Sequence, residues 1–454
     1  MFHGDTIAAI STPPGRGGIG IVRLSGPDAL TIAGQLFCPT GGGFGDPNRA
    51  TYGRIIDPEL DESADVAVAV VYRAPHSYTG EDIVELSCHG SPIILSGVLE
   101  LALARGARLA EPGEFTMRAF LNRKLDLLQA QAVRDLIEAQ TTYQARLASR
   151  QLEGRMSKRL NPLKQTVIDV IVHLESAVEF VEDDISTEAA TSLAARLAAT
   201  TDELNRIAAT FSFGRLVRDG FDLAIAGRPN VGKSSVFNRL VGTDRAIVTE
   251  IPGTTRDALY ETTSIAGLPV RLIDTAGIRE TTDRVETMGI ERSRTAIADA
   301  DLSLLVLDGS ESLTQDDSAL LAQVPPETRI VVVNKTDLPR KLADNAAGEA
   351  DCICVSALTG SGFDELTDRI LKVLAGDSAA ERDGIMLTDA RQQQAVRRAA
   401  EQLSDATTLL GGGELEEIVL LKLRGALEAL GEVTGETLTD DILSRIFSTF
   451  CIGK

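Results

Sequence analysis

The stretch GRPNVGKSS, residues 227–235, constrains the fold of this 454-residue chain more than any other segment. It follows the apolar run FDLAIA and precedes a helical pattern, and it fits the template G-x-x-x-x-G-K-[ST] in full. In that template, backbone N–H groups surround the α- and β-phosphates of a nucleotide. The lysine, here Lys233, reaches the β- and γ-phosphates, and the hydroxyl of Ser234 binds Mg²⁺. The stretch therefore predicts a strand, a phosphate-binding loop and a helix, in that order.

Three later motifs indicate which nucleotide binds. DTAG (274–277), NKTD (334–337) and SAL (356–358) each follow an apolar run that is typical of a strand. Asp274 can bind Mg²⁺ through water, and Gly277 can meet the γ-phosphate. Asp337 can accept both N–H groups of a guanine edge, which rejects adenine. Four elements in this order and at this spacing predict a GTP-hydrolysing module.

The segment TEIPGTTRD (249–257) lies where the first switch of such a module is expected. It offers Thr254 and Thr255 for sensing Mg²⁺ and the γ-phosphate. The residue after Gly277 is Ile278, whereas Ras-like proteins use a glutamine there to orient the attacking water. Hydrolysis therefore needs another device, and the sequence by itself identifies no arginine finger.

Changes in composition and in the spacing of apolar residues along the chain predict a multidomain protein of the α+β and α/β classes. Residues 1–120 are rich in Gly, Pro and β-branched residues and predict an α+β domain, and residues 121–218 show helical spacing. Residues 219–378 alternate short strands with helices, which is typical of a mostly parallel sheet. Residues 379–454 return to a helical pattern. We expect the α/β module to be inserted into one helical domain whose two halves pack together.

Composition bounds the location and the partners of the chain. Apolar residues make up 43% and charged residues 24%, which is ordinary for a globular protein, and we expect a cytoplasmic location without a signal peptide or membrane span. The five cysteines are too scattered for a zinc ribbon. A net charge of −21 argues against a surface that binds nucleic acid everywhere. The basic stretch 146–164 is either a solvated helix face or a local RNA-facing patch.

Two further features need an interpretation. GRGGIG (15–20) matches a dinucleotide-binding pattern, but a strand-like run follows it instead of a helix, so that function is not expected. Cys451 lies in the terminal segment FCIGK, beyond the last helical pattern, and the ending does not suit prenylation. Cys451 is either an inert packing residue or a catalytic thiol.

Together these motifs resemble a known family. GRPNVGKSS, PGTTRD, DTAG and NKTD are similar to the Era/Der/TrmE class of bacterial GTPases. The opening DTIAAISTPPGRGGIGIVRLSG, the segments HSYTGEDIVELSCHG and PGEFTMRAFLNRKLDLLQAQAV, and the terminal CIGK look like the TrmE (MnmE) tRNA modification GTPases. This resemblance extends over the whole chain.

The resemblance implies an N-terminal folate-binding domain that forms a homodimer, a helical domain, and an inserted Ras-like G domain. It implies that the protein acts with a flavoprotein of the MnmG (GidA) type, which carries FAD and uses NADH, in a heterotetramer or larger complex. The pair would add an aminomethyl or carboxymethylaminomethyl group at C5 of the wobble uridine of certain tRNAs. The one-carbon unit would come from 5,10-methylene-tetrahydrofolate, of which 5-formyl-tetrahydrofolate is an analogue.

The resemblance also implies roles for individual residues. Folate contacts fall on Arg23, Glu81, Lys124 and Lys454, and catalytic roles fall on Cys451 and, through water, on Glu286. A potassium ion in place of an arginine finger would be held near Asn230, Thr249, Ile251 and Thr254, and Mg²⁺ by Ser234 and Thr255. The residues expected to contact GTP are Asn230, Val231, Gly232, Lys233, Ser234, Ser235, Thr249, Glu250, Ile251, Pro252, Gly253, Thr254, Thr255, Asp274, Thr275, Ala276, Gly277, Asn334, Lys335, Thr336, Asp337, Ser356, Ala357 and Leu358.

An alternative function from another class stays open on the sequence alone. A GTP-dependent assembly factor that acts on ribosomes, as Era and Der do, would use the same nucleotide motifs. Such proteins carry RNA-binding appendages, whereas this chain has a long N-terminal α+β region and a terminal cysteine. Binding of a folate would separate the two functions.

Overall fold

The computed structural model describes residues 4–57, 62–179, 190–242, 260–273, 300–342, 352–375, 385–412 and 416–453. The chain divides into two compact units. The first consists of Met1–Arg134 together with Thr434–Lys454, and the second of Asp135–Val433. The C-terminal segment therefore belongs to the same unit as the N-terminal domain.

The first unit is built on a seven-stranded sheet with the strand order β3-β4-β5-β6-β2-β1-β7. Its neighbours pair antiparallel except for β1 and β7, which are parallel. The strands are β1 Ile7–Ile10, β2 Gly17–Ser25, β3 Phe37–Pro39, β4 Ala50–Asp57, β5 Glu62–Tyr72, β6 Ile83–Gly90 and β7 Arg108–Leu109. Strand β2 lies between β6 and β1, so its backbone is paired along both edges.

The two faces of this sheet differ in chemistry. One face carries Val22, Leu24, Val84 and Leu86, and it packs against helices α1 (Ala29–Leu36) and α2 (Pro92–Ala104) in an apolar core. The alternation of side chains along a strand sends Arg23 to the opposite face. That face carries a smaller apolar cluster around Phe115 of α3 (Glu114–Leu121), and polar side chains surround it.

The C-terminal helix α15 (Asp440–Phe447) completes the first unit. Its residues Leu443 and Phe447, with Phe450 beyond it, form a core cluster with Met117 of α3 and Leu127 of α4 (Leu127–Glu138). These aromatic and aliphatic side chains are buried. Burial of this apolar surface fixes the end of the chain against the N-terminal domain.

The second unit contains a six-stranded sheet with the order β13-β12-β11-β8-β10-β9. All neighbours pair parallel except β9 and β10, which form an antiparallel hairpin at one edge. The elements are β8 Phe221–Ala226, α9 Lys233–Gly242, β9 Tyr260–Ile265, β10 Leu268–Ile273, β11 Leu302–Asp308, α11 Gln315–Gln323, the 3-10 turn Pro326–Thr328, β12 Arg329–Asn334, β13 Ile353–Cys354 and α12 Phe363–Ala375. The predicted mostly parallel sheet is confirmed.

Local sequence explains these elements. The run LSLLVLD of β11 is buried at every position, as expected for a central parallel strand that is covered on both faces. Helix α11 begins with a capping box, in which the Thr314 hydroxyl accepts from the backbone N–H of Asp317 and the Asp317 side chain accepts in return. Buried runs and caps of this kind are readable directly from the sequence.

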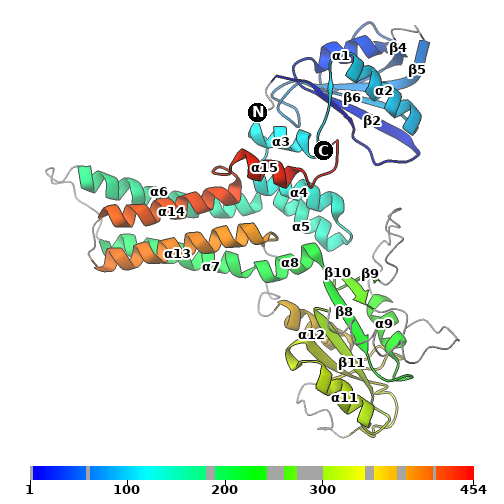
Figure 1. The fold of residues 1–454 in the computed structure, drawn as a ribbon, viewed down its shortest axis with the longest axis vertical. Coiled ribbons are helices and arrows are strands. Elements are labelled where there is room, and N and C mark those ends of the chain that lie inside the picture. The colour runs from blue at the N-terminus through cyan, green and yellow to red at the C-terminus, as the bar shows by residue number, and fades with distance from the viewer. Residues whose placement is uncertain are drawn as a thin grey trace. The chain divides into compact units, whose positions relative to one another are not determined.

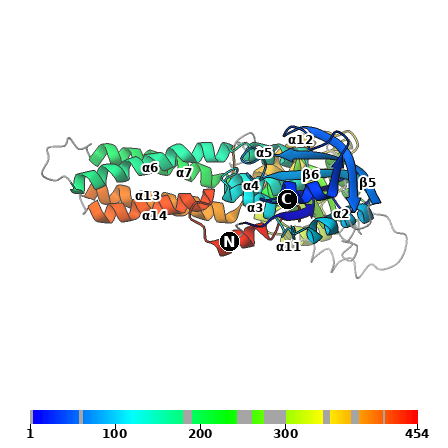
Figure 2. The same ribbon diagram turned by 90° about the horizontal axis from the view of Figure 1, so that it is seen from above.

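Helices on both sides of the inserted sheet form one bundle. They are α5 Thr142–Leu152, α6 Arg155–Glu179, α7 Ala190–Ala209, α8 Phe211–Asp219, α13 Ala390–Gly412 and α14 Glu416–Thr434. Helix α7, before the sheet, packs along α13, after it, and Figures 1 and 2 show α6, α7, α13 and α14 side by side. The expected insertion of an α/β module into a helical domain is therefore confirmed.

One boundary differs in detail from the sequence pattern. The helical spacing expected from residue 121 becomes a helix only at Leu127, because α3 ends at Leu121. Helix α2 ends at Ala104, and Thr439 precedes α15 without a capping hydrogen bond from its side chain. Within the described ranges, no helix is both long enough and apolar enough to cross a membrane.

Candidate functional site

The phosphate-binding template forms the connection between β8 and α9. Gly232 has a φ of +94°, and a Cβ there would lie 2.3 Å from the side-chain nitrogen of Asn334. Only glycine accommodates this approach and this backbone angle. Asn230 also has a positive φ of +65°, which places this polar residue at the exposed tip of the loop. The predicted strand, loop and helix are all present.

Lys233 begins helix α9 and folds back over the loop. Its Nζ donates to the carbonyl oxygens of Gly227 at 2.9 Å and Arg228 at 2.8 Å. Partial burial lowers the pKa of the Lys233 ammonium. Ser234 and Ser235 follow in the first turn, so the hydroxyl groups and the helix N-terminus lie where a phosphate and its Mg²⁺ are bound in such loops.

Asn334 connects three of the nucleotide motifs. It closes β12 and is 2% exposed. Its Nδ2 donates to the carbonyl oxygen of Val231 at 3.0 Å, and its Oδ1 accepts from the backbone N–H of Ala357 at 3.1 Å. One amide side chain therefore fixes the phosphate-binding loop relative to the NKTD and SAL segments.

Asp337 lies in the turn after β12, beside the SAL segment. The hydroxyl of Ser356 donates to Asp337 Oδ1 at 2.5 Å, and the backbone N–H of Thr336 donates to Val355. One carboxylate oxygen of Asp337 is thus held in place. Leu358, the last residue of the SAL segment, is exposed. A fixed carboxylate suits bidentate acceptance from a guanine edge.

No sequence motif indicates the ion pair that supports this turn. Lys335 has a φ of +64°, and its Nζ lies 2.5 Å from Oδ2 of Asp308, the last residue of β11. Burial acts to raise the pKa of Asp308, but the hydrogen bonds from Lys335 and Ser310 and the charge of Lys335 together outweigh it, so the pKa is lowered. The pair joins the ends of two adjacent strands, which only the strand order makes neighbours.

Several predicted positions fall outside the described residues. They are Thr249, Glu250, Ile251, Pro252, Gly253, Thr254 and Thr255 of the first switch, Asp274, Thr275, Ala276 and Gly277 of DTAG, and also Ile278, Glu286 and Lys454. The expected binding of GTP, potassium, Mg²⁺ and folate by these residues, and the catalytic role of Glu286 through water, stay predictions.

Arg23, expected to contact folate, lies on the polar face of the first unit's sheet. It pairs with Glu85 directly opposite on β6, with Nη2 2.7 Å from Oε1. The guanidinium also lies 5.6 Å from the ring centroid of Phe115 and 5.9 Å from that of Tyr78. The site thus combines a charged fork with aromatic surfaces, which suits a flat ligand that carries polar edges.

The loop 73–82, between β5 and β6, brings the predicted folate residues together. It carries Tyr78, whose ring lies beside the Arg23 guanidinium, and Glu81, which accepts a 2.7 Å hydrogen bond from Ser25. Arg23 and Ser25 both belong to β2. Lys124, in the turn after α3, donates from Nζ to the carbonyl oxygen of Pro75 in this loop at 3.0 Å. Arg23, Glu81 and Lys124 therefore all adjoin one segment, although they come from distant parts of the sequence.

The segment around Cys451 is seated in the same unit by backbone contacts. The N–H of Gly113 donates to the carbonyl oxygen of Cys451 at 3.2 Å. Gly453 has a φ of +91°, and a Cβ there would lie 2.4 Å from the carbonyl oxygen of Ile10. The Cys451 side chain is exposed, so this thiol is not buried as a core residue would be.

The basic stretch 146–164 is partly neutralised by local partners. Arg155 lies 2.9 Å from Glu153, and Arg159 lies 2.7 Å from Glu203 of α7. Lys158 donates to the carbonyl oxygen of Glu153. Such contacts are compatible with a solvated helix face, and an RNA-facing role for the stretch stays a prediction.

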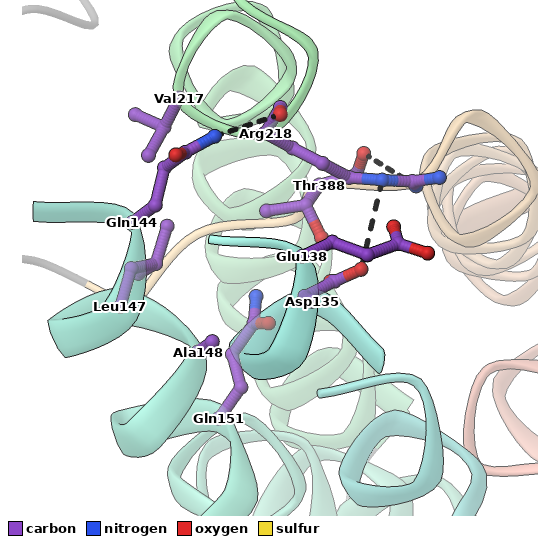
Figure 3. Close-up of a pocket in the computed structure, with 9 residues that line it drawn as sticks. All are labelled: Asp135, Glu138, Gln144, Leu147, Ala148, Gln151, Val217, Arg218 and Thr388. Atoms are coloured by element: carbon purple, nitrogen blue, oxygen red, sulfur yellow. Dashed lines mark hydrogen bonds and ion pairs between the residues drawn. The ribbon is translucent and has the colours of Figure 1, made fainter. Parts of the chain in front are cut away.

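A small pocket lies where the inserted sheet joins the helices (Figure 3). Arg218, at the end of α8, donates to the carbonyl oxygen of Thr388 at 3.2 Å and lies 3.8 Å from Asp135. Gln144 of α5 donates to the carbonyl oxygen of Arg218 at 3.0 Å. Both connections between sheet and helices, around residues 219 and 388, are therefore tied to one arginine.

Comparison with known proteins adds to this geometry. A family described as "MnmE helical domain" matches residues 127–451, and one described as "GTP-binding protein TrmE N-terminus" matches residues 6–124. A tRNA modification GTPase MnmE from Koribacter versatilis is 50% identical over 452 residues, which are 99% of each chain. One from Roseiflexus castenholzii is 44% identical over 473 aligned residues and 100% of each chain.

Among solved structures, the G domain of the T. maritima FeoB iron transporter is 27% identical to this chain. The match covers 34% of this chain and 98% of that domain, with a TM-score of 0.26.

Proposed function

The chain belongs to the MnmE family of tRNA modification GTPases, and on this premise we propose that it uses GTP hydrolysis to drive modification of the wobble uridine in tRNA. The observation that carries the GTPase part is the position of Asn334, which connects the phosphate-binding loop to the NKTD and SAL segments. A nucleotide that contacts all three segments would bind to groups whose relative positions are fixed by the hydrogen bonds of Asn334.

Each described residue of the nucleotide site has a separate task. The loop N–H groups and Lys233 bind phosphates, the Ser234 hydroxyl would ligate Mg²⁺, and Asp337 selects guanine. When bound there, Mg²⁺ would neutralise negative charge on the phosphates. We further propose that a potassium ion, held with the help of Asn230, supplies the positive charge that an arginine finger supplies elsewhere.

The first unit provides a second site, which we propose for a tetrahydrofolate that donates a one-carbon unit. The pterin ring has N–H donors on one edge and two flat faces. Glu81 can accept those N–H groups, while Tyr78 and Phe115 lie beside Arg23 as aromatic surfaces. Lys124, close to the same loop, suits a carboxylate of the folate tail.

The chemistry at C5 of uridine would need further participants. We propose that the protein acts as a homodimer with a flavoprotein of the MnmG type, which holds FAD and uses NADH. Together they would attach an aminomethyl or carboxymethylaminomethyl group. The exposed thiol of Cys451, seated in the first unit, is the nucleophile or proton donor that this chain contributes.

Nucleoside composition of tRNA from cells that lack this protein tests the proposal. We expect uridines modified at C5 of the wobble position to disappear, and to return when the intact gene is supplied. A ribosome assembly factor would instead leave the tRNA nucleosides unchanged and alter the ratio of ribosomal subunits. That second result would overturn the proposed function.

A further inference from the structure

Five charged side chains form a connected cluster on the polar face of the first unit. They come from four different segments and comprise three carboxylates and two guanidiniums: Asp5 before β1, Glu81 in loop 73–82, Arg108 in β7, and Glu114 and Arg118 in α3. Glu114 is 0% exposed and Arg118 is 2% exposed. Charges this deeply buried are stable only when each has close partners.

Arg118 lies at the centre of the cluster and contacts all three carboxylates. Its Nη2 lies 2.6 Å from Asp5 Oδ1 and 2.9 Å from Glu114 Oε1. Its Nη1 lies 3.2 Å from both carboxylate oxygens of Glu81. Nη1 also donates to the backbone carbonyl of Asp5 at 3.0 Å. Asp5 and Glu114 therefore fix the orientation of the Arg118 guanidinium, and this orientation directs Nη1 at Glu81.

A relay of hydroxyl groups holds Glu81 from the other side. The Ser25 hydroxyl has one hydrogen and donates it to Glu81 Oε2 at 2.7 Å. Thr79, which lies 2.7 Å from Ser25 and is fully buried, must then be the donor in that pair. The backbone N–H of Glu81 donates to Thr79 at 3.2 Å. Because Arg118 and Ser25 both donate to the Glu81 carboxylate, they hold it in one orientation.

This arrangement leaves part of Glu81 available to a ligand. Its side chain is 23% exposed, whereas Arg118 behind it is almost completely covered. A carboxylate offers about four acceptor positions, and the two anchors occupy only the inner ones. The outward lone pairs therefore point away from the buried cluster, in a direction that Arg118 determines.

We propose that Arg118 is a positioning residue for folate binding, which holds the Glu81 carboxylate as an aimed acceptor for the N–H edge of the pterin. The inference rests on the folate-binding role proposed above. Arg118 itself, buried behind Glu81, does not touch the ligand. The remaining members, Asp5 and Glu114, act by fixing the guanidinium of Arg118.

Arg108 provides a matched control from the same cluster. It binds the same two carboxylates as Arg118, with Nε 2.7 Å from Asp5 and Nη2 2.6 Å from Glu114. The guanidinium contacts to Glu81 come from Arg118. A purely structural cluster would make the two arginines equivalent for ligand binding, whereas a positioning role makes them differ.

The test is calorimetric binding of 5-formyl-tetrahydrofolate to the full-length protein and its variants. Arg118→Lys keeps a positive charge but loses the planar fork, and we expect affinity to fall roughly tenfold or more, as for a lost hydrogen bond to a charged group. Arg108→Lys should change affinity by less than about twofold, within the spread of distant substitutions. Both variants should melt at a lower temperature than the parent protein.

A double-mutant cycle with Glu81→Gln provides the sharper measurement. If Arg118 acts through Glu81, Arg118→Lys will weaken binding much less in the Glu81→Gln background than in the parent protein. Equal losses in both backgrounds, or equal losses for the two arginine variants, would overturn the inference. If Arg118→Lys does not fold, Ser25→Ala, which removes the opposite anchor, replaces it in the same cycle.

Binding of 5-formyl-tetrahydrofolate by the parent protein distinguishes a failure of the positioning role from a failure of the folate-binding role. If the unmodified protein does not bind 5-formyl-tetrahydrofolate, the folate-binding role fails and the inference fails with it. If the parent protein binds and Arg118→Lys binds equally well, only the positioning role is wrong.

Discussion

Asn334 Nδ2 donates to the carbonyl oxygen of Val231 across 3.0 Å, and so joins the base-recognition motif to the phosphate-binding loop. The same side chain accepts from Ala357, so its amide is satisfied at both ends while it is buried. Two halves of the nucleotide site, one for phosphate and one for base, are thus held at a fixed separation.

Asn334→Ala should weaken GTP binding strongly. The change leaves the buried carbonyl of Val231 and the partly buried N–H of Ala357 without their partner, at a cost of about 1–3 kcal/mol for a fully buried group. We expect at least a tenfold rise in the Kd for GTP, measured with a fluorescent GTP analogue, on the order of 1.4 kcal/mol. Asn238→Ala, at an exposed position of α9, is the control and should bind normally. Normal binding by Asn334→Ala would contradict the bridging role.

Asp337→Asn should change the choice of nucleotide. The substitution exchanges a pair of acceptors for one acceptor and one donor, which fits a xanthine edge better than guanine. The Ser356 hydroxyl can still donate to the remaining oxygen, so the turn should keep its shape. Competition between GTP and xanthosine triphosphate measures the effect, and continued preference for GTP would refute the role of Asp337.

GTP hydrolysis should be faster in potassium than in sodium at equal ionic strength. An arginine finger accelerates related reactions by about 10³–10⁵-fold, and a potassium ion at the same place should give at least about tenfold. Asn230→Ala should remove most of the difference between the two salts. Initial rates of phosphate release in the two chlorides provide the measurement, and equal rates would exclude potassium activation.

Cys451→Ser should abolish tRNA modification and leave GTP hydrolysis unchanged, because the phosphate-binding loop supplies its own contacts. Gly453→Ala tests the seating of the same segment without altering the thiol. A Cβ at Gly453 would lie 2.4 Å from the Ile10 carbonyl oxygen, so the tail must shift and modification should fall.

Gly411→Ala, in α13 with open space around it, is the matched glycine control for the tail. Nucleoside analysis and phosphate release measure the two activities in each variant. Full modification by Cys451→Ser would return this cysteine to a packing role.

The buried cluster around Arg118 should make the first unit sensitive to acid. Burial acts to raise the pKa of Glu114, but hydrogen bonds from Arg108, the Glu111 backbone and Arg118 outweigh it and lower the pKa below 4.5. The pKa of Asp5 is likewise lowered below 3.8, because its hydrogen bonds to Arg108 and Arg118 outweigh burial. A lowered folded-state pKa contributes stability above the unfolded value, and this contribution is lost as the pH falls through the folded value.

We therefore expect the melting temperature of the parent protein to fall as the pH drops below 4.5. Glu114→Gln should melt at a lower temperature near neutral pH and should show a shallower decline in acid. Glu100→Gln, at an exposed position of α2, should follow the parent protein. Calorimetric scans from about pH 7 to about pH 3 provide the comparison. Parallel curves for Glu114→Gln and the parent protein would contradict this account.

Much of the nucleotide site could be predicted from the sequence because it depends on local backbone geometry. Gly232, Lys233 and Ser234 lie next to one another, and NKTD follows a buried strand directly, so short motifs specify their conformations. The ion pair of Lys335 with Asp308 could not be predicted in this way. It depends on β11 lying next to β12, which is a property of the sheet.

The order of the elements, the inserted parallel sheet and the phosphate and base motifs could be predicted from the amino-acid sequence, because apolar periodicity and glycine-containing turns act over a few residues. Which distant groups meet depends on the packing of whole elements. Arg118 contacts Asp5 across 113 positions of the chain, and Arg134 contacts Thr449 across 315. Such contacts follow from strand pairing and helix packing, in which the burial of apolar surface over whole elements fixes where individual charges come together.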